Sequence, residues 1–265
     1  MAEEASKAAD APNVTTEFAL RVGGATLRAT VQLPASRTTL TELLPILQGI
    51  ENTILDQVAV EAEAAGRPIS CRAGCGACCR QLVPLSLFEA EAMTKWLKTL
   101  PEDRIAALRQ RFHVALSALR DAGVIDRILD GKWMNDEETN TRLNLDYFYA
   151  GVPCPFLEDE SCSIHPIRPL SCREYLVTSS PELCKDPGAH AIAGLQLPVR
   201  LSKTLFAFGR HIEKDQRGWI PLVFLLAWGK SGAKPGDGVS GSGPEVLQLF
   251  LRELEAHSRE AEEEG

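Results

Sequence analysis

Alternating apolar and polar residues near the N-terminus predict a β-hairpin. Between Val14 and Leu33, apolar side chains occupy every second position on either side of Gly23-Gly24. Such alternation places one face of each strand against a core, and glycine reaches the positive φ that a tight hairpin turn requires. Because an isolated hairpin is only marginally stable, we expect it to pack on the rest of the chain.

Helical periodicity follows the hairpin. Apolar residues recur at three- and four-residue steps from Thr39 to Ala65, which predicts an amphipathic helix. Ser86 and Glu89 have the spacing of a capping box, so a second helix is expected from there to Pro101. A third is expected over residues 101–122, where the apolar positions again share one face.

The middle of the chain has weaker periodicity. Residues 124–150 resemble short helices and turns, whereas residues 151–198 are rich in proline and lack a sustained period. We expect the second segment to be irregular backbone that something other than a strand ladder holds in place.

The C-terminal part is helical again in its pattern. Helices are expected at residues 199–215 and 219–228, followed by a glycine- and serine-rich flexible linker at 229–243. The last segment, 244–265, has one apolar stripe and predicts a helix. We expect this helix to be available for docking an unidentified protein partner.

Composition and charge narrow the class of protein. The 265 residues are 45% hydrophobic and 24% charged, within the globular range, and the formal net charge is −8. A net negative charge argues against nucleic-acid and anionic-membrane partners, which require clustered Lys and Arg. The first 13 residues are acidic and alanine-rich, so they predict a disordered tail without a secretory signal, and the longest apolar run is half a membrane span. We therefore expect a cytoplasmic protein whose cysteines stay reduced.

The candidate metal ligands are eight cysteines in two groups: Cys71, Cys75, Cys78, Cys79, Cys154, Cys162, Cys172 and Cys184. The first four fall within nine residues, where Gly74 and Gly76 permit the tight turn that a metal knuckle needs. Cys78 and Cys79 are adjacent, so they serve one site only through a bent or helical backbone. The later four are too widely spaced for a local knuckle, which predicts that the two groups fold together.

Basic residues follow four of these cysteines. Cys71, Cys79 and Cys172 precede Arg, and Cys184 precedes Lys. Four thiolates around a divalent ion form a dianion, and nearby cations offset that charge and lower thiol pKa values. Arg168 is expected to add to this positive environment.

Other interpretations of the cysteines have less support. Scattered buried thiols would not form two clusters of four, and a disulfide scaffold would need an oxidising compartment. His165 has zinc-ligand spacing from Cys162, and whether it binds metal stays open. The spacing of Cys71, Cys75 and Cys78 also matches the radical S-adenosylmethionine motif, but the chain lacks the strand and helix repeats of that barrel.

The set of motifs resembles the YkgJ-type cysteine-cluster family. The resemblance covers about residues 64–186 and is carried by Cys71 to Arg80, Ser86 with Glu89, Cys154-Pro-Phe-Leu157, Cys162-Ser-Ile-His165, Arg168-Pro169 and Cys172-Arg173. The first spacer has three residues where the CxxCxxCC pattern has two. The resemblance implies a zinc- or iron-chelating domain, commonly with an iron–sulfur centre. It also implies similarity to the cysteine-rich part of flagellin lysine N-methylases, without by itself implying methyltransferase activity.

Together these patterns predict a mainly α-helical protein with a small N-terminal β-hairpin and an irregular cysteine-rich segment stapled by metal. A single metal-binding domain is expected over residues 14–228. The preferred cofactor is a 4Fe-4S cluster with a redox or enzyme-assisting role, either as an oxidoreductase or in methylase-like protein modification. A zinc-stapled structural domain without catalysis is the alternative, and a metal-free thiol switch through Cys78 and Cys79 is a third.

Overall fold

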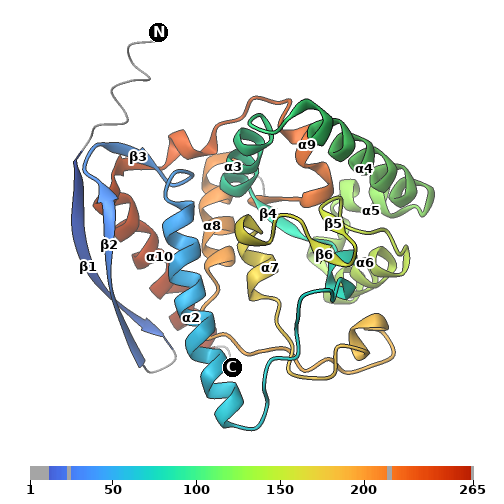
Figure 1. Ribbon diagram of the computed structural model, residues 1–265, viewed down its shortest axis with the longest axis horizontal. Helices are drawn as coiled ribbons and strands as arrows, with labels where there is room; N and C mark the ends of the chain where they lie inside the picture. Colours follow the sequence, from blue (N-terminus) through green and yellow to red (C-terminus); the bar gives the residue numbers. More distant parts are fainter. Residues whose placement is uncertain (1–11, 23–24, 214–216, 264–265) are drawn as a thin grey trace.

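In the computed structural model, the N-terminal hairpin is the outermost layer of the molecule (Figure 1). The structure describes residues 12–22, 25–213 and 217–263. Strands β1 (Asn13–Val22) and β2 (Ala25–Pro34) pair antiparallel, with Phe18 opposite Ala29. The predicted hairpin is confirmed; its Gly23-Gly24 turn and most of the predicted tail lie outside the described residues.

The first long helix, α2 (Leu44–Ala64), begins five residues later than its apolar pattern suggests. The preceding residues form the short strand β3 (Arg37–Thr39) and a turn. In that turn the Glu42 carboxylate accepts hydrogen bonds from the Thr39 amide at 2.7 Å and hydroxyl at 2.9 Å. These side-chain hydrogen bonds compete with the helix for the backbone donors, so the helix starts only after them.

The two helices expected after the first cysteine group are present. Strand β4 (Pro84–Ser86) leads into α3 (Leu87–Leu97), and α4 (Glu102–Asp121) follows Pro101. The capping box is complete, because the Ser86 hydroxyl accepts from the Glu89 amide and the Glu89 carboxylate accepts from the Ser86 amide. The capping-box pattern of Ser86 and Glu89 therefore predicted the start of α3 correctly.

Residues 124–150 form a second helical layer. It contains α5 (Val124–Asp130), the 3₁₀ turn η3 (Lys132–Asn135) and α6 (Glu137–Tyr149). Their apolar side chains pack with the end of α4 in a core that includes Leu119, Ile128 and Leu143. This layer forms one side of the cysteine region (Figure 1).

The proline-rich segment is mostly irregular, as predicted. Its short elements are β5 (Leu157–Glu158), β6 (Ser161–Cys162), η4 (His165–Ile167), α7 (Leu170–Glu174) and η5 (Leu183–Lys185). The β5–β6 hairpin turns at Asp159 and Glu160, which have φ of 49° and 56°. α7 contacts both α2 and α8 (Leu201–Glu213), so the segment is anchored at its centre.

The expectation of a helix across residues 219–228 is wrong for its first half. This run forms β7 (Trp219–Pro221), η6 (Leu222–Phe224) and only then the short helix α9 (Leu225–Trp228). β7 pairs with β4, with Leu85 opposite Ile220. A short apolar run does not distinguish a buried strand from a helix. Here pairing with β4 favours the strand conformation for residues 219–221.

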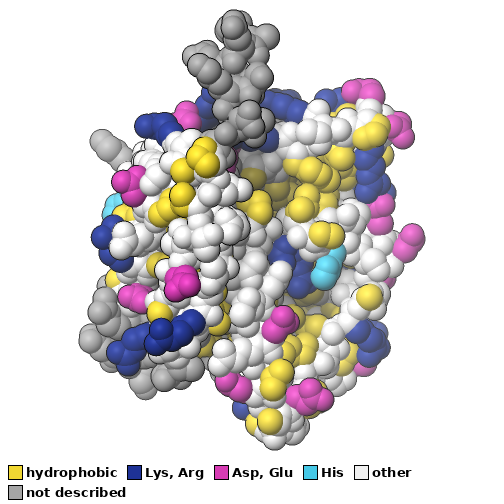
Figure 2. Space-filling view, turned by 60° about the vertical axis from the view of Figure 1, so that its left-hand side comes forward, with side chains coloured by type: hydrophobic (Ala, Val, Ile, Leu, Met, Phe, Trp, Pro, Cys, Tyr) yellow, Lys and Arg dark blue, Asp and Glu magenta, His cyan; other side chains and the backbone are white. Residues whose placement is uncertain are grey.

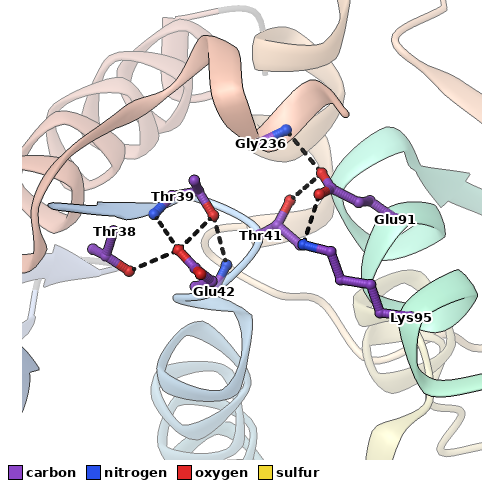
Figure 3. A network of polar contacts seen from close by, with 7 residues as sticks. All are labelled: Thr38, Thr39, Thr41, Glu42, Glu91, Lys95 and Gly236. Carbon is purple, nitrogen blue, oxygen red and sulfur yellow. Dashed lines mark hydrogen bonds and ion pairs between the residues drawn. The ribbon is translucent and has the colours of Figure 1, made fainter. Parts of the chain in front are cut away.

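The expectation of a flexible linker at 229–243 is also wrong. This segment contains η7 (Pro235–Gly238) and β8 (Ser240–Ser242), which pairs with β3. Figure 3 shows how α3 holds it: the Glu91 carboxylate accepts from the Gly236 amide at 2.9 Å and the Thr41 hydroxyl at 2.8 Å. A Cβ at Gly236 would lie 2.6 Å from the Thr41 hydroxyl oxygen, so glycine here permits close packing rather than flexibility.

The last helix, α10 (Gly243–Glu263), is confirmed, but its apolar stripe is covered. Val246, Leu247, Phe250 and Leu254 are buried in the core that α10 forms with the hairpin, α2 and α8. This stripe is therefore not free for a partner protein, because the chain's own hairpin and helices occupy it.

The described part of the chain is mainly α-helical with small antiparallel sheets, which agrees with the helical and hairpin parts of the predicted fold class. None of its described helices combines the length and hydrophobicity needed to cross a membrane. On the face shown in Figure 2, basic, acidic and hydrophobic side chains are interspersed.

Candidate metal centre

The early cysteines lie on a tight loop that ends in the 3₁₀ turn η2 (Ala77–Arg80). Gly74 has a φ of +79°, which an L side chain rarely adopts. At Gly76 a Cβ would lie 2.5 Å from a Glu160 carboxylate oxygen and 2.9 Å from the Leu157 side chain. Gly74 therefore serves the turn as predicted, whereas Gly76 has an ordinary φ of −91° and instead lets the loop pass close to the β5–β6 hairpin.

Backbone and side-chain contacts join the two cysteine groups. The Cys154 amide donates to the Cys79 carbonyl at 2.7 Å, and the Val177 amide donates to Cys71 Sγ at 3.4 Å. Arg80 forms an ion pair with Glu160 at 2.7 Å across the same junction. The prediction that remote parts of the chain meet at the cysteines is thus confirmed for these contacts.

Five of the eight cysteines line one cavity of about 500 Å³. They come from both groups: Cys78, Cys79, Cys154, Cys162 and Cys172. The wall also includes apolar side chains such as Phe156 and Leu222, both of which are buried. The cavity therefore presents several sulfur atoms in largely apolar surroundings.

The other three cysteines lie beside this cavity. Cys75 lines a neighbouring cavity, Cys71 is exposed, and Cys184 is buried on η5, which contacts η2. The charge of a Cys71, Cys75 or Cys78 thiolate raises the pKa of Cys184, after the larger effect of burial. All eight predicted ligands thus belong to one region of the fold.

All eight cysteines are free thiols, so the disulfide interpretation is not supported. Among the described residues, however, no three His, Cys, Asp or Glu side chains are arranged so that they could hold a metal ion. The structure brings the thiols to a shared cavity without converging them on one point.

The environment of the thiols favours their protonated form when no cation is bound. Burial raises the pKa of Cys154 to about 12. It also raises the pKa of Cys172, where the charges of Cys154 and Cys78 add to the effect. The pKa of Cys78 is raised first by its hydrogen bond with Cys79 and then by burial. A bound cation would reverse this preference, so the donor set fits a thiophilic metal.

Several of the predicted cations do face the cysteines. Arg168 lines the cysteine cavity, and its charge lowers the pKa values of Cys78 and Cys162 against the larger effect of burial. The pKa of Lys185 is raised mainly by its ion pair with Glu182 and, to a smaller extent, by the charge of Cys75. These cations partly offset the charge of a multi-thiolate site.

Buried polar contacts position the helix that holds Cys172. Glu89 accepts from the Leu170 amide at 2.7 Å, at the start of α7. Arg173 is buried and donates to the Asn52 side chain at 2.9 Å and the Arg168 carbonyl at 3.1 Å. Arg173 therefore acts mainly in holding this segment to α2.

His165 starts η4, is exposed, and is not among the described residues that line the cysteine cavity. The positive charge of Arg168 lowers its pKa, which favours the neutral imidazole. Whether it binds metal stays open.

Sequence reasoning missed Tyr175, Arg200, Lys203 and Phe206, which also line the cavity. For three of them the sequence indicates a shared helix face but not a position at the cavity. Arg200, Lys203 and Phe206 recur at three-residue steps and so share one face of a helix, but nothing in the pattern shows that this face meets the cysteines.

Comparison with known proteins agrees with the geometry. No curated protein and no solved structure matches the chain. Residues 70–189 match a family model named CxxCxxCC and described as a "Putative zinc- or iron-chelating domain". The matched range contains all eight cysteines. Residues 70–189 of this chain are therefore similar to the domain that the CxxCxxCC family model describes, which supports the suspected cysteine-cluster family.

Proposed function

We propose that the cysteines of both groups bind an iron–sulfur centre, preferably 4Fe-4S, and that the protein has a redox or enzyme-assisting role. The observation that carries the proposal is the cavity lined by five thiols from two parts of the chain. Thiolates are the usual protein ligands of such clusters. When bound, such a centre supplies one-electron transfer.

One feature favours iron over zinc. Eight neighbouring thiols exceed the four ligands of a structural zinc ion.

The chain's own residues have separate roles in this proposal. The cysteines supply the ligands, and Arg168 stabilises their thiolate form. Phe156, Ile164 and Leu222 exclude water from the cavity wall and lower the local dielectric constant. Both effects would set the reduction potential of a bound cluster.

The electrostatic coupling of the thiols suggests two ligand sets around Cys78. After the larger effect of burial, charges on Cys71 and Cys75 raise the pKa of Cys184, and charges on Cys154 and Cys162 raise the pKa of Cys172. Cys78 interacts with members of both sets. We propose that Cys78 is the residue on which bound metal depends most.

The test is anaerobic purification of the full chain, with its absorption spectrum and its iron, zinc and sulfide content. We expect a broad band near about 400 nm and acid-labile sulfide, as for thiolate-bound clusters. Cys78→Ser and Cys172→Ser should lose most of the iron. A colourless protein with stoichiometric zinc would refute the iron proposal and support the structural alternative.

The matched control is Met93→Leu. Met93 is buried in α3 and does not line the cysteine cavity, so this change removes a sulfur atom at nearly constant volume. Its metal content should equal that of the unchanged protein. Equal metal content in all variants would contradict a thiol-bound centre.

A further inference from the structure

A second cavity lies beside the cysteine cavity and shares part of its lining. The second cavity has a volume of about 430 Å³ and is lined by Arg200, Lys203 and Phe206, which also line the first. Each volume lies within the range of about 300–1,000 Å³ that small-molecule sites occupy. The two cavities are therefore neighbours that share a wall at the start of α8.

That shared wall is strongly basic in a chain whose net charge is −8. Arg168 lines the first cavity, Arg210 lines the second, and Arg200 and Lys203 line both. Among the described lining residues of the two cavities, Glu174 is the one acidic side chain. Cations therefore outnumber carboxylates here, opposite to the chain as a whole.

These cations have few partners within the protein. Glu174 accepts hydrogen bonds from the Ser202 amide and hydroxyl and lies 3.8 Å from Arg200, so its charge is already engaged. Lys203 and Arg210 form no ion pair with any residue of the described ranges, and Nε of Arg168 is buried without a hydrogen-bond partner. Unpaired donors at the wall of a cavity suit an anionic ligand.

The remaining wall is apolar and aromatic. Leu82, Tyr175, Phe206 and Leu222 face the cysteine cavity, and Leu197 and Leu254 line the second. A fully hydrated inorganic anion would leave these surfaces without contacts, whereas an apolar body would cover them. The combination selects a molecule with an anionic group and an apolar part.

We propose that this two-part cavity binds a small amphipathic organic anion, with Arg200 and Lys203 holding its carboxylate or phosphate group. Its apolar part would then lie along Phe206 against the cysteine-lined wall. The role of this ligand as the substrate rests on the proposed function, but its binding does not. A carboxylate and a phosphate ester both present anionic oxygen atoms to Arg200 and Lys203, and the test distinguishes between them.

The test measures binding by isothermal titration calorimetry on the full chain at low ionic strength. The probes are octanoate, phenyl phosphate and the neutral octanamide. We expect at least one of the two anions to bind about tenfold or more tightly than octanamide. Tighter binding of octanoate would assign a carboxylate, and tighter binding of phenyl phosphate would assign a phosphate ester.

The variant is Lys203→Gln, and the matched control is Lys230→Gln. Both lysines are exposed and unpaired within the described chain, so neither change should affect folding, but Lys230 lines neither cavity. Lys203→Gln should weaken anion binding about tenfold and leave octanamide unchanged, whereas Lys230→Gln should change neither. Equal binding of anions and octanamide, equal effects of the two variants, or no binding of either anion at millimolar concentration would overturn the proposal.

The metal content of the same samples keeps the two proposals separate. Anion binding that depends on Lys203 in a protein without metal would support this site and refute the proposed function. A metal-loaded protein that binds neither anion would do the reverse.

Discussion

Gly76 lies where the early cysteine loop passes the β5–β6 hairpin, and an added Cβ would have to displace side chains of that hairpin. The nearest neighbours of an added Cβ would be Glu160 and Leu157. The sequence shows that glycines separate the early cysteines. It does not show that Gly76 packs against Glu160, which lies 84 residues later in the chain.

We predict that Gly76→Ala lowers both metal content and stability. The methyl group would push aside the Leu157 side chain and the Glu160 carboxylate, and so weaken the Arg80–Glu160 ion pair that joins the loop to the hairpin, at a cost of about 1 kcal/mol. Urea denaturation and metal analysis measure the two effects. Gly49→Ala is the control, since a Cβ there meets nothing within 4 Å and alanine favours the helix. An unchanged metal content in Gly76→Ala would show that this close approach does not matter.

Glu51 is a second residue whose role no sequence pattern revealed. Its side chain is fully buried in α2, and neither carboxyl oxygen has a hydrogen-bond partner. Burial, and then the charge of Glu174, raises its pKa to about 9. Glu51 therefore holds a proton at neutral pH in the folded protein and loses it on unfolding.

From this shift we predict that stability falls as pH rises from about 4.5 towards 9. Below this range both states hold the proton, and above the folded pKa the stabilisation by the bound proton is lost. Glu51→Gln resembles the protonated form, so it should be more stable than the unchanged protein at pH 8–9, by about 1–3 kcal/mol, and similar near pH 5. Thermal unfolding at these pH values measures the difference. The same difference at both pH values would contradict a protonated Glu51.

At the scale of elements, the junction of α3 with α7 positions the later cysteines. Residues 86–89 predicted the capping box, and the structure has it. The second oxygen of Glu89 bonds to the Leu170 amide, 81 residues later, a contact that no local pattern encodes. Similarly, the strand β7 and the ordered segment 229–243 depend on partners β4 and β3, which is why local composition misassigned both.

We predict that Glu89→Gln destabilises the protein by about 1–3 kcal/mol and reduces metal content. Glu89 accepts through both of its oxygens, whereas a glutamine amide has only one acceptor oxygen. The backbone amide of either Ser86 or Leu170 would therefore lose its acceptor and face the NH₂ group instead. Because Leu170 starts the helix that holds Cys172, the metal ligands should shift. Chemical denaturation and iron or zinc analysis test this.

Glu42→Gln is the matched control for that change. Glu42 also accepts backbone and hydroxyl hydrogen bonds near a helix start, but it lies outside the residues that line the cysteine cavity. All of these hydrogen bonds use one carboxylate oxygen, which glutamine keeps, so this variant should retain both its stability and its metal. Equal metal loss in both variants would indicate a global rather than a local effect.

At the scale of the whole molecule, the cysteine region lies between separate hydrophobic cores. One core joins the hairpin, α2, α8 and α10, and the other two involve α3 to α6 and α9. The sequence predicted the helices, the hairpin and the approach of the two cysteine groups. It did not predict the cavity beside them, because α8 reaches that cavity only through tertiary packing.

We predict that removing metal destabilises one part of the molecule more than the others. Hydrogen exchange after treatment with a chelator should rise most in residues 151–198, where the regular elements are short. The core formed by the hairpin and α10 should change little, because apolar packing holds it. Uniform exchange across the chain would contradict a local stapling role.

The most direct test of a shared metal centre is thiol alkylation read by mass spectrometry, on anaerobically purified protein before and after chelation. We predict that cysteines from both groups, Cys78, Cys154 and Cys172 among them, become reactive together when metal is removed. If chelation left the reactivity of every cysteine unchanged, or exposed only the early group, the two groups would not bind a common metal centre.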